Sequence, residues 1–181
     1  NQKDFENRLK FSNIDEREDD FFLKSNLRLN SKKKSIFFQR HFVTNFLRKK
    51  YSVNNVDKRI NHKKFLKKLN KAKISVGSFG WGEICYREFE ATIMGACIIY
   101  PNISYIKTWP NIYINNQTCL TYDLNFGNLE EKINKVLVND KLRKELVHNA
   151  QNVLRNVLKK DGLDYMLNFL LDKLYTYLHD H

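Results

Sequence analysis

The sequence predicts an α/β domain with a helical C-terminal tail, and three observations support that fold class. The 181 residues are 42% hydrophobic, which is enough for one globular core and short for two. Between residues 73 and 100 a strand, a glycine-rich loop, a helix and a second strand follow in order, as in a βαβ unit. Helical spacing of apolar residues dominates after residue 128.

We expect three segments along the chain. Residues 1–20 are highly charged and form an arm or a surface helix, residues 21–160 form the α/β domain, and residues 161–181 form a C-terminal helix that packs on it. No stretch approaches the roughly 18 consecutive apolar residues that a membrane-spanning helix needs. The chain begins with Asn1 and no apolar leader follows, so we expect the natural protein to be longer.

The first elements are a strand and two helices. Phe21–Leu23 is a short apolar run typical of a buried strand. Residues 35–51 have largely helical apolar spacing, with Ser35 as the N-cap and basic residues in the last turn. Residues 57–71 predict an amphipathic helix with a basic outer face.

The middle of the chain contains the βαβ unit. Lys73–Val76 predicts a strand that ends at Gly77. Residues 83–94 predict a helix that closes at Gly95 in the left-handed conformation. Ala96–Tyr100 predicts a buried strand that Pro101 stops.

The second half alternates short strands with helices. Ile112–Ile114 and Leu120–Tyr122 predict strands, separated by a turn at Asn115 and Asn116. Asn128 caps a helix whose core-facing residues are Leu129, Ile133, Val136 and Leu137. Asp140 caps another that runs to about Leu158, and an apolar helix over residues 163–178 follows a break at residues 159–162.

Charge is distributed unevenly around a net value of +12. Residues 1–73 hold 21 Lys and Arg against 8 Asp and Glu, whereas residues 74–181 hold 11 against 12. A basic first part attracts polyanions or steers small phosphorylated ligands towards a cleft, and an ordinary solvated lysine-rich surface is the alternative.

The three cysteines, Cys85, Cys97 and Cys119, are an odd number without C-x-x-C spacing. That usage suits a reducing compartment, and we interpret all three as small buried hydrophobic residues. We therefore expect a cytoplasmic protein, bacterial or, if viral, in the host cytoplasm.

Three of the six glycines, Gly77, Gly80 and Gly82, lie within six positions. A strand that ends in glycines and turns into a helix presents unpaired N–H groups and a helix dipole, which together favour phosphate. Glycine also lets an anion approach the backbone closely. The spacing matches neither the Walker loop nor the dinucleotide fingerprint. A tight strand-to-helix turn without a ligand is the alternative.

Polar residues on the following helix extend this hypothesis. Arg87 is placed to pair with phosphate oxygens near the helix start, and Glu90, one turn further, to accept hydrogen bonds from ribose hydroxyls. The alternative is a surface ion pair worth a few tenths of a kcal/mol. Trp81 and Tyr86 either stack on a base or sugar or fill the core, and we favour the core for Tyr86.

The segment ISVGSFGWGEICYREFEATIMGACIIYPN resembles the donor-site motif of glycosyltransferases of the GT-B fold. It is most similar to the exostosin-like and spore-coat-type branch, in which F-G-W-G-E-x-x-x-R-x-F-E-A recurs. The likeness is strong over about residues 73–135, moderate to residue 158 and weak before residue 70. It implies one half of a GT-B fold: a Rossmann-like three-layer domain that binds a nucleotide-sugar donor.

The resemblance also implies roles for individual residues. Arg87 neutralises the departing nucleoside diphosphate of a UDP- or GDP-sugar without an obligatory metal, and Glu90 holds the ribose. The commonest GT-B pattern has two glutamates eight positions apart, and Gly82 occupies the place of the first. Glu83 substitutes for that glutamate as a catalytic residue. The donor-binding set is completed by the loop residues and by two basic residues after the first strand: Gly77, Ser78, Phe79, Gly80, Trp81, Gly82, Lys24 and Arg28.

The resemblance leaves the acceptor open. A complete GT-B enzyme has two Rossmann-like domains, and this chain has room for one, so we expect an acceptor domain elsewhere in the full-length chain or in another subunit. The acceptor is a glycan, a lipid or a protein. His41 and His62 are candidate bases, although each is more often a helix-surface or core histidine.

Two other functions compete with the glycosyltransferase hypothesis. A nucleic-acid-binding module would use three aromatic residues of the first part among basic ones, namely Phe37, Phe38 and Phe42 among Arg40, Arg48 and Lys49. Its binding would depend on salt and survive Arg87→Ala, but helical spacing favours a core position for these aromatics. A structural protein that keeps the fold without the chemistry is the third hypothesis.

Overall fold

The computed structural model describes residues 11–15, 17–23, 34–53, 60–80 and 82–157, together with Gly162, Asp164 and Asn168. The predicted break at residues 159–162 and the predicted last helix lie almost entirely outside this part. Among the described helices, none is long and apolar enough to cross a membrane.

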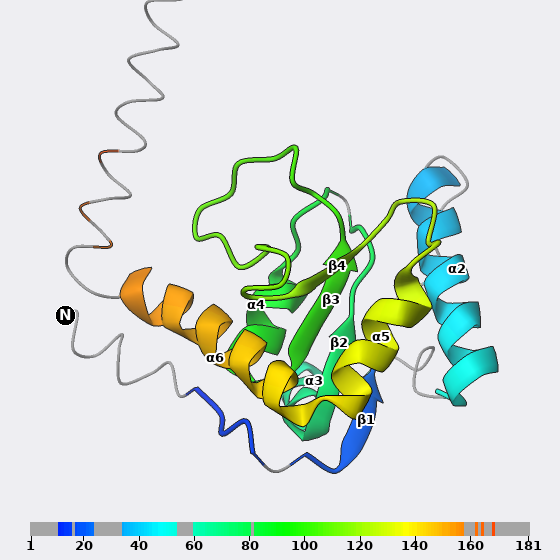
Figure 1. Ribbon diagram of the computed structural model, residues 1–181, viewed down its shortest axis with the longest axis horizontal. Coiled ribbons are helices and arrows are strands. Elements are labelled where there is room, and N and C mark those ends of the chain that lie inside the picture. Colours follow the sequence, from blue (N-terminus) through cyan, green and yellow to red (C-terminus); the bar gives the residue numbers. More distant parts are fainter. Residues whose placement is uncertain are drawn as a thin grey trace, which may run out of the picture.

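Four parallel strands form the sheet, in the order in which they occur in the chain (Figure 1). They are β1 (Asp19–Phe22), β2 (Ala72–Val76), β3 (Cys97–Pro101) and β4 (Leu120–Tyr122). The register pairs Phe21 with Ile74, Ser75 with Ile98, and Tyr100 with Thr121. Because all strands run the same way, their carboxyl ends lie along one edge of the sheet.

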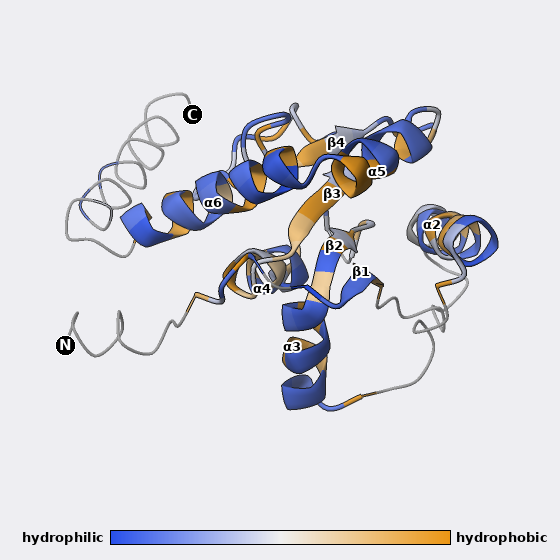
Figure 2. Cartoon of the chain, turned by 60° about the horizontal axis from the view of Figure 1, so that its bottom comes forward, coloured by the Kyte–Doolittle hydropathy of each residue, from blue (hydrophilic) through white to orange (hydrophobic). Residues whose placement is uncertain are grey.

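Helices cover both faces of this sheet. Those described are α2 (Lys34–Tyr51), α3 (His62–Lys71), α4 (Tyr86–Ile93), α5 (Leu129–Val138) and α6 (Asp140–Val157). Figure 2 shows α5 and α6 on one side of the strands and α3 and α4 on the other. The predicted α/β class with three layers is confirmed.

Alternating strand side chains divide the core into two clusters. Ile74 and Ile99 pack with α2, α5 and α6 through residues such as Leu47 and Ile133. Ile98 and Tyr100 face the other way, towards α3, α4 and the segment after β3. Strands buried on both faces explain the nearly continuous apolar run of β3.

The glycine loop is longer than predicted, because α4 begins at Tyr86 and not at residue 83. Cys85 precedes the helix in an extended conformation, and the hydroxyl of Tyr100 donates to the carbonyl of Glu83 at 2.7 Å. Glu83 therefore belongs to the loop. Tyr86, predicted for the core, is 89% exposed in the first turn of α4.

The predicted strand Ile112–Ile114 does not form. The backbone N–H of Tyr113 donates to Oδ1 of Asn111 and that of Ile114 to Oγ1 of Thr118, so side chains replace a strand partner. Ile112 and Tyr113 are buried, which is why the segment has the composition of a strand.

Helix ends account for the remaining differences. Asn61 caps α3 by accepting from the N–H of Lys64, so that helix starts at residue 62 and not 57. Ser35 lies inside α2, and Asn139 accepts from the N–H of Leu142 at the start of α6 in place of Asp140. Gly95 has φ of 76° at the end of α4, as predicted.

Candidate functional site

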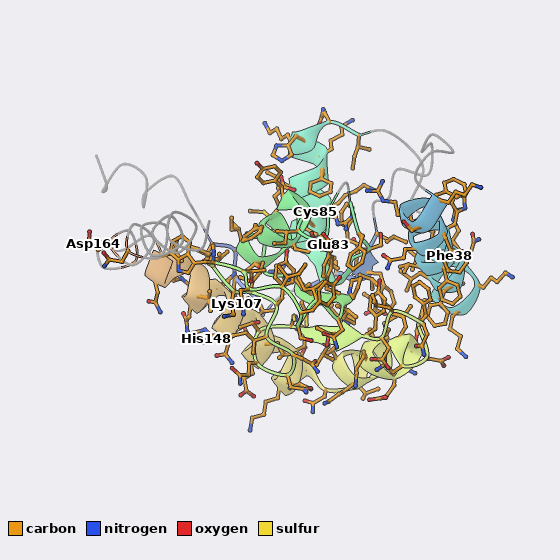
Figure 3. All side chains as sticks on the ribbon, turned by 90° about the horizontal axis from the view of Figure 1, so that it is seen from above. Phe38, Glu83, Cys85, Lys107, His148 and Asp164 are labelled. Atoms are coloured by element: carbon orange, nitrogen blue, oxygen red, sulfur yellow. The ribbon has the colours of Figure 1, made fainter. Side chains whose placement is uncertain are left out.

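The carboxyl edge of the sheet gathers the loops that follow β2, β3 and β4, and ligands of open α/β sheets bind at this edge. Figure 3 looks down on this edge, with Glu83 and Cys85 close together in the loop after β2. Helix α2 lies beside that loop and supplies two of the side chains described next.

One pocket at this edge, the glycine-loop pocket, has a volume of about 340 Å³. Its lining residues are Ser35, Gln39, Phe79, Gly80, Gly82, Glu83 and Leu124. Four of them were predicted as donor-binding or catalytic residues. Ser35, Gln39 and Leu124 were missed, because no spacing in the sequence connects α2 or the loop after β4 with the glycine cluster.

Two side chains of α2 hold the loop in place. The N–H of Phe79 donates to Oε1 of Gln39 at 3.2 Å, and Nε of Arg40 donates to the carbonyl of Phe79 at 2.9 Å. Burial, followed by the charge of Arg87, lowers the pKa of Arg40. Arg40 thus points into the protein and contributes nothing to a basic outer surface.

Arg87 lies beneath the loop. Its Nη2 donates to the carbonyl of Ser78 at 2.8 Å, and its Nε donates to Oε1 of Glu88 at 2.9 Å. The side chain of Arg87 is 15% exposed and that of Glu88 is 2% exposed. Burial lowers the pKa of Arg87, but the Glu88 carboxylate, together with Tyr100 and Cys85, raises it by more. Arg87 is a fully charged brace for the loop.

The three glycines have different environments. A Cβ at Gly77 would lie 2.3 Å from Cδ2 of Tyr100, and a Cβ at Gly80 would lie 2.3 Å from Sγ of Cys85. A Cβ at Gly82 would meet nothing within 4 Å. Gly77 and Gly80 are therefore required by packing, and Gly82 faces open space.

Several loop amides are already engaged within the protein. The N–H of Gly77 donates to the carbonyl of Ile99, and the N–H of Gly80 to the carbonyl of Gly82. With Phe79 bonded to Gln39, the expectation of a row of unpaired N–H groups does not hold for these three positions. The sequence suggested the row because it gave no sign of the partners.

The predicted polar residues do not all converge on the pocket. Glu83 lines it and is half-buried. Glu90 instead accepts from Nε2 of His62 at 2.6 Å, between α4 and α3. Neither Arg87 nor Glu90 lines the pocket. Lys24, Arg28 and Trp81 lie outside the described residues.

The aromatic residues of α2 are more exposed than the helical spacing suggested. Phe38 is 61% exposed, and Phe37 and Phe42 are also exposed. Phe42 nevertheless stacks on Phe126 with ring centroids 4.0 Å apart, and the Phe37 ring lies 4.0 Å from the ring of His41. The Phe38 ring lies edge-on to that of Phe126, with centroids 6.1 Å apart. The exposure of these aromatic residues removes the argument that they fill the core, but Arg40 is turned inward and adds nothing to a nucleic-acid surface here.

The cysteines are free, and Cys97 and Cys119 are buried as predicted, whereas Cys85 is half-buried. In the part of the chain that the structure describes, no group of three or more His, Cys, Asp or Glu residues is placed to hold a metal ion.

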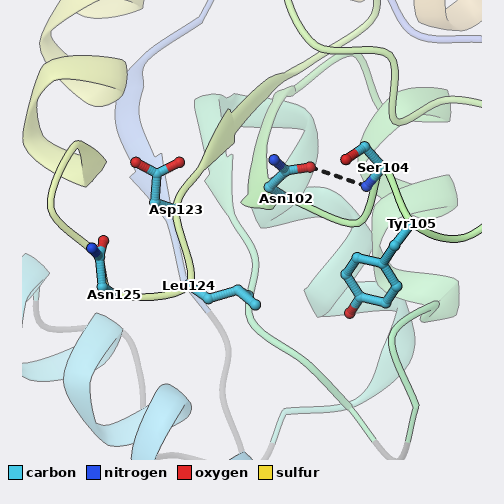
Figure 4. A pocket seen from close by; sticks show the side chains of 6 residues that line it. All are labelled: Asn102, Ser104, Tyr105, Asp123, Leu124 and Asn125. Atoms are coloured by element: carbon cyan, nitrogen blue, oxygen red, sulfur yellow. Dashed lines mark hydrogen bonds between the residues drawn. The ribbon is translucent and has the colours of Figure 1, made fainter.

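A second pocket adjoins the first. This β3–β4 pocket has a volume of about 410 Å³ and shares Leu124 with the glycine-loop pocket. Its other lining residues follow the two strands: Asn102, Ser104, Tyr105, Asp123 and Asn125 (Figure 4). Sequence reasoning missed it, although polar residues directly after two adjacent parallel strands were a usable signal.

No family model and no curated protein matches the chain. Solved structures do. A sucrose-phosphate synthase from Thermosynechococcus elongatus is 13% identical, with a TM-score of 0.54. The match covers 94% of this chain and 51% of the synthase. The C-terminal domain of the group 1 glycosyl transferase LpcC from Francisella tularensis is 11% identical with a TM-score of 0.51, covering 88% and 94%.

A third solved structure, TarM, is 13% identical with a TM-score of 0.58, covering 88% of this chain and 36% of its own. The chain thus spans about half the length of the synthase and about a third of TarM. Identities this low show the fold alone. The described chain has the α/β fold of a glycosyltransferase C-terminal domain.

Proposed function

We propose that the chain is the donor-binding domain of a GT-B glycosyltransferase of the exostosin-like branch. It binds a nucleoside diphosphate sugar, such as a UDP- or GDP-sugar, and its sugar is transferred to an acceptor. One observation carries the proposal: a pocket built on the glycine loop lies at the carboxyl edge of a sheet whose fold is shared with solved glycosyltransferases.

The charges beneath the loop suit a diphosphate. Arg40 and Arg87 both donate to loop carbonyls, and Glu88 is bonded to Arg87. The two guanidiniums place positive charge directly under the loop. A fixed field of this kind stabilises the charge that develops on a departing diphosphate, and in this proposal it does so without an obligatory metal.

Two glutamates complete the proposed site. Glu83 lines the pocket and is available to a hydroxyl of the transferred sugar. Glu90 binds the ribose in this proposal, which requires its carboxylate to exchange or share the hydrogen bond with His62. The acceptor is supplied by a second domain, in the full-length chain or in another subunit.

The test uses Gly82, the glycine that faces open space. Isothermal titration of UDP and GDP into the 181-residue chain is compared between the wild type, Gly82→Phe and Gly82→Ala. Gly82 lines the pocket, so we expect a phenyl ring added there to take space from the nucleotide and to cause at least a tenfold loss of affinity, about 1.4 kcal/mol. Gly82→Ala is the matched control and should bind like the wild type, since its methyl group meets nothing within 4 Å.

Unchanged affinity in a folded Gly82→Phe protein would place the nucleotide elsewhere. A folded wild type that binds neither UDP nor GDP at millimolar concentration would reject donor binding by this chain. Repeating the titration with EDTA and with Mn²⁺ tests the proposed independence from metal.

A further inference from the structure

The β3–β4 pocket has a lining unlike that of the glycine-loop pocket. It is formed by the first residues after two adjacent strands, and Figure 4 shows Asp123 and Asn125 on one side, Ser104 and Tyr105 on the other, and Leu124 between them. Among the described residues that line it there is no Lys or Arg. The charged side chain among them is the carboxylate of Asp123, which disfavours phosphate and other anions.

Two of its amides are oriented by the backbone. Oδ1 of Asn102 accepts from the N–H of Ser104 at 3.0 Å, and Oδ1 of Asn125 accepts from the N–H of Gly127 at 2.9 Å. Each bond uses the amide oxygen and leaves the NH₂ group as a donor. Beside them, the exposed carboxylate of Asp123 is an acceptor and the Ser104 hydroxyl is both.

The same pocket also presents apolar surface. Tyr105 is 63% exposed and Leu124 is 49% exposed, so both side chains offer apolar surface to a ligand. Small-molecule sites combine such apolar walls with a few placed polar groups. Fixed amide donors, a carboxylate acceptor and an aromatic face match one ligand chemistry well: a ring with hydroxyl groups around its rim and C–H bonds on its faces.

We propose that the β3–β4 pocket binds a neutral sugar ring. The volume of about 410 Å³ accommodates a hexose, and the shared Leu124 places that ring beside the glycine-loop pocket. The ring belongs either to a glycan acceptor or to the donor, and the chemistry of recognition is the same for both. Only this adjacency to a donor rests on the proposed function.

The test replaces the aromatic wall and the acceptor together, in the double variant Tyr105→Ala/Asp123→Asn. Both side chains are exposed, so the variant is expected to fold. Val138→Ala and Glu145→Gln, two exposed positions on α5 and α6 outside both pockets, are the control. The first probes are a panel of methyl glycosides and short oligosaccharides, whose binding is measured by saturation-transfer NMR. The second are UDP-glucose, UDP-N-acetylglucosamine and GDP-mannose, whose affinities are measured by titration and compared with those of UDP and GDP.

We expect the double variant to lose at least fivefold in affinity for a sugar, with UDP and GDP binding unchanged. Loss of free-glycoside binding identifies an acceptor sugar, and loss of the extra affinity of a nucleotide-sugar over its nucleotide identifies the donor sugar. If glycosides bind through this pocket while nucleotides do not bind at all, the proposed function fails and the sugar site stands. If neither sugar probe responds to the double variant, or no sugar binds, the inference is wrong.

Discussion

The two halves of the glycine loop differ in what holds them. In the inner half, Gly77–Phe79, all three residues are bonded or packed against buried groups: Tyr122 donates to Gly77, Arg87 to Ser78, and Arg40 to Phe79. In the outer half, Gly80, Gly82 and Glu83, the contacts are fewer: Gly80 packs on Cys85 and Tyr100 donates to Glu83, but Gly82 has open space around it and Glu83 lines a pocket.

This difference shows that one motif serves two purposes. The inner half and the side chains beneath it form a positively charged base, and the outer half, together with Phe79, forms the surface that a ligand can reach. Changes below the loop should therefore act mainly on stability, and changes at its exposed end mainly on binding. The predictions below test that division, starting with the largest effect.

Arg87→Ala should cause the largest loss of stability, because it leaves the buried carboxylate of Glu88 without its partner. Removing one member of a buried pair costs about 3–5 kcal/mol. Urea unfolding measures the loss, with Lys50→Ala as the control, since its exposed pair with Glu130 is worth about 1 kcal/mol or less. A stable Arg87→Ala protein that merely fails to bind UDP would move Arg87 from the base of the loop to the ligand.

The same variant has a predictable pH dependence. Burial raises the pKa of Glu88, and Arg87 lowers it, so the variant raises it further. A carboxyl whose pKa is higher in the folded protein than in the unfolded chain favours folding at low pH and opposes it as pH rises. The deficit of Arg87→Ala relative to the wild type should therefore be smaller at pH 5 than at pH 8.

Gly77→Ala should be the next most damaging change. The added methyl group would lie 2.3 Å from the ring of Tyr100 and 2.9 Å from Oε1 of Glu88, and neither neighbour is free to move. Overpacking of this kind costs about 1–3 kcal/mol. Gly82→Ala should stay within about 0.5 kcal/mol of the wild type in the same urea titrations. Equal losses at the two glycines would contradict the division of the loop.

The sequence was sufficient for the βαβ unit but not for the details of its loops. The βαβ order followed from apolar runs and glycines, because burial on both faces leaves a continuous pattern in a strand. The start of α4 did not follow, since helical spacing extends back to Ile84 while Tyr100, seventeen residues after Glu83, holds that residue in the loop. Such a contact leaves no local signal.

Much of the candidate site was predictable for a similar reason. Four of the pocket residues could be predicted, because a glycine-rich strand end is a local feature of the sequence: Phe79, Gly80, Gly82 and Glu83. The partner of Arg87 was not predictable: the spacing suggested Glu90, but the guanidinium reaches the adjacent Glu88, and Glu90 turns to His62. The choice between two nearby carboxylates depends on burial, which tertiary packing decides.

The smallest predicted effect is on the alkylation rates of the cysteines. These rates compare the glycine loop, at Cys85, with the sheet, without a change to either. Burial raises the pKa of Cys97 to about 12, despite the opposing charge of Arg143, and burial also raises that of Cys119 to about 12. Cys85, beside Gly80, also has a raised pKa, chiefly through burial, but it is only half-buried. Alkylation requires the thiolate, so all three should react more slowly than free cysteine at pH 8.

We expect iodoacetamide to label Cys85 first and to leave Cys97 and Cys119 unmodified until the protein unfolds, as measured by mass spectrometry of peptides over time. The rate at Cys85 should keep rising with pH beyond the usual range of a free thiol. A methyl group at Gly77 overpacks the base of the loop, whereas one at Gly82 meets nothing, so Gly77→Ala should speed the labelling of Cys85 more than Gly82→Ala does. Faster labelling of Cys97 than of Cys85 would mean that the sheet opens before the loop does, and the inner half would then not be the more firmly held region.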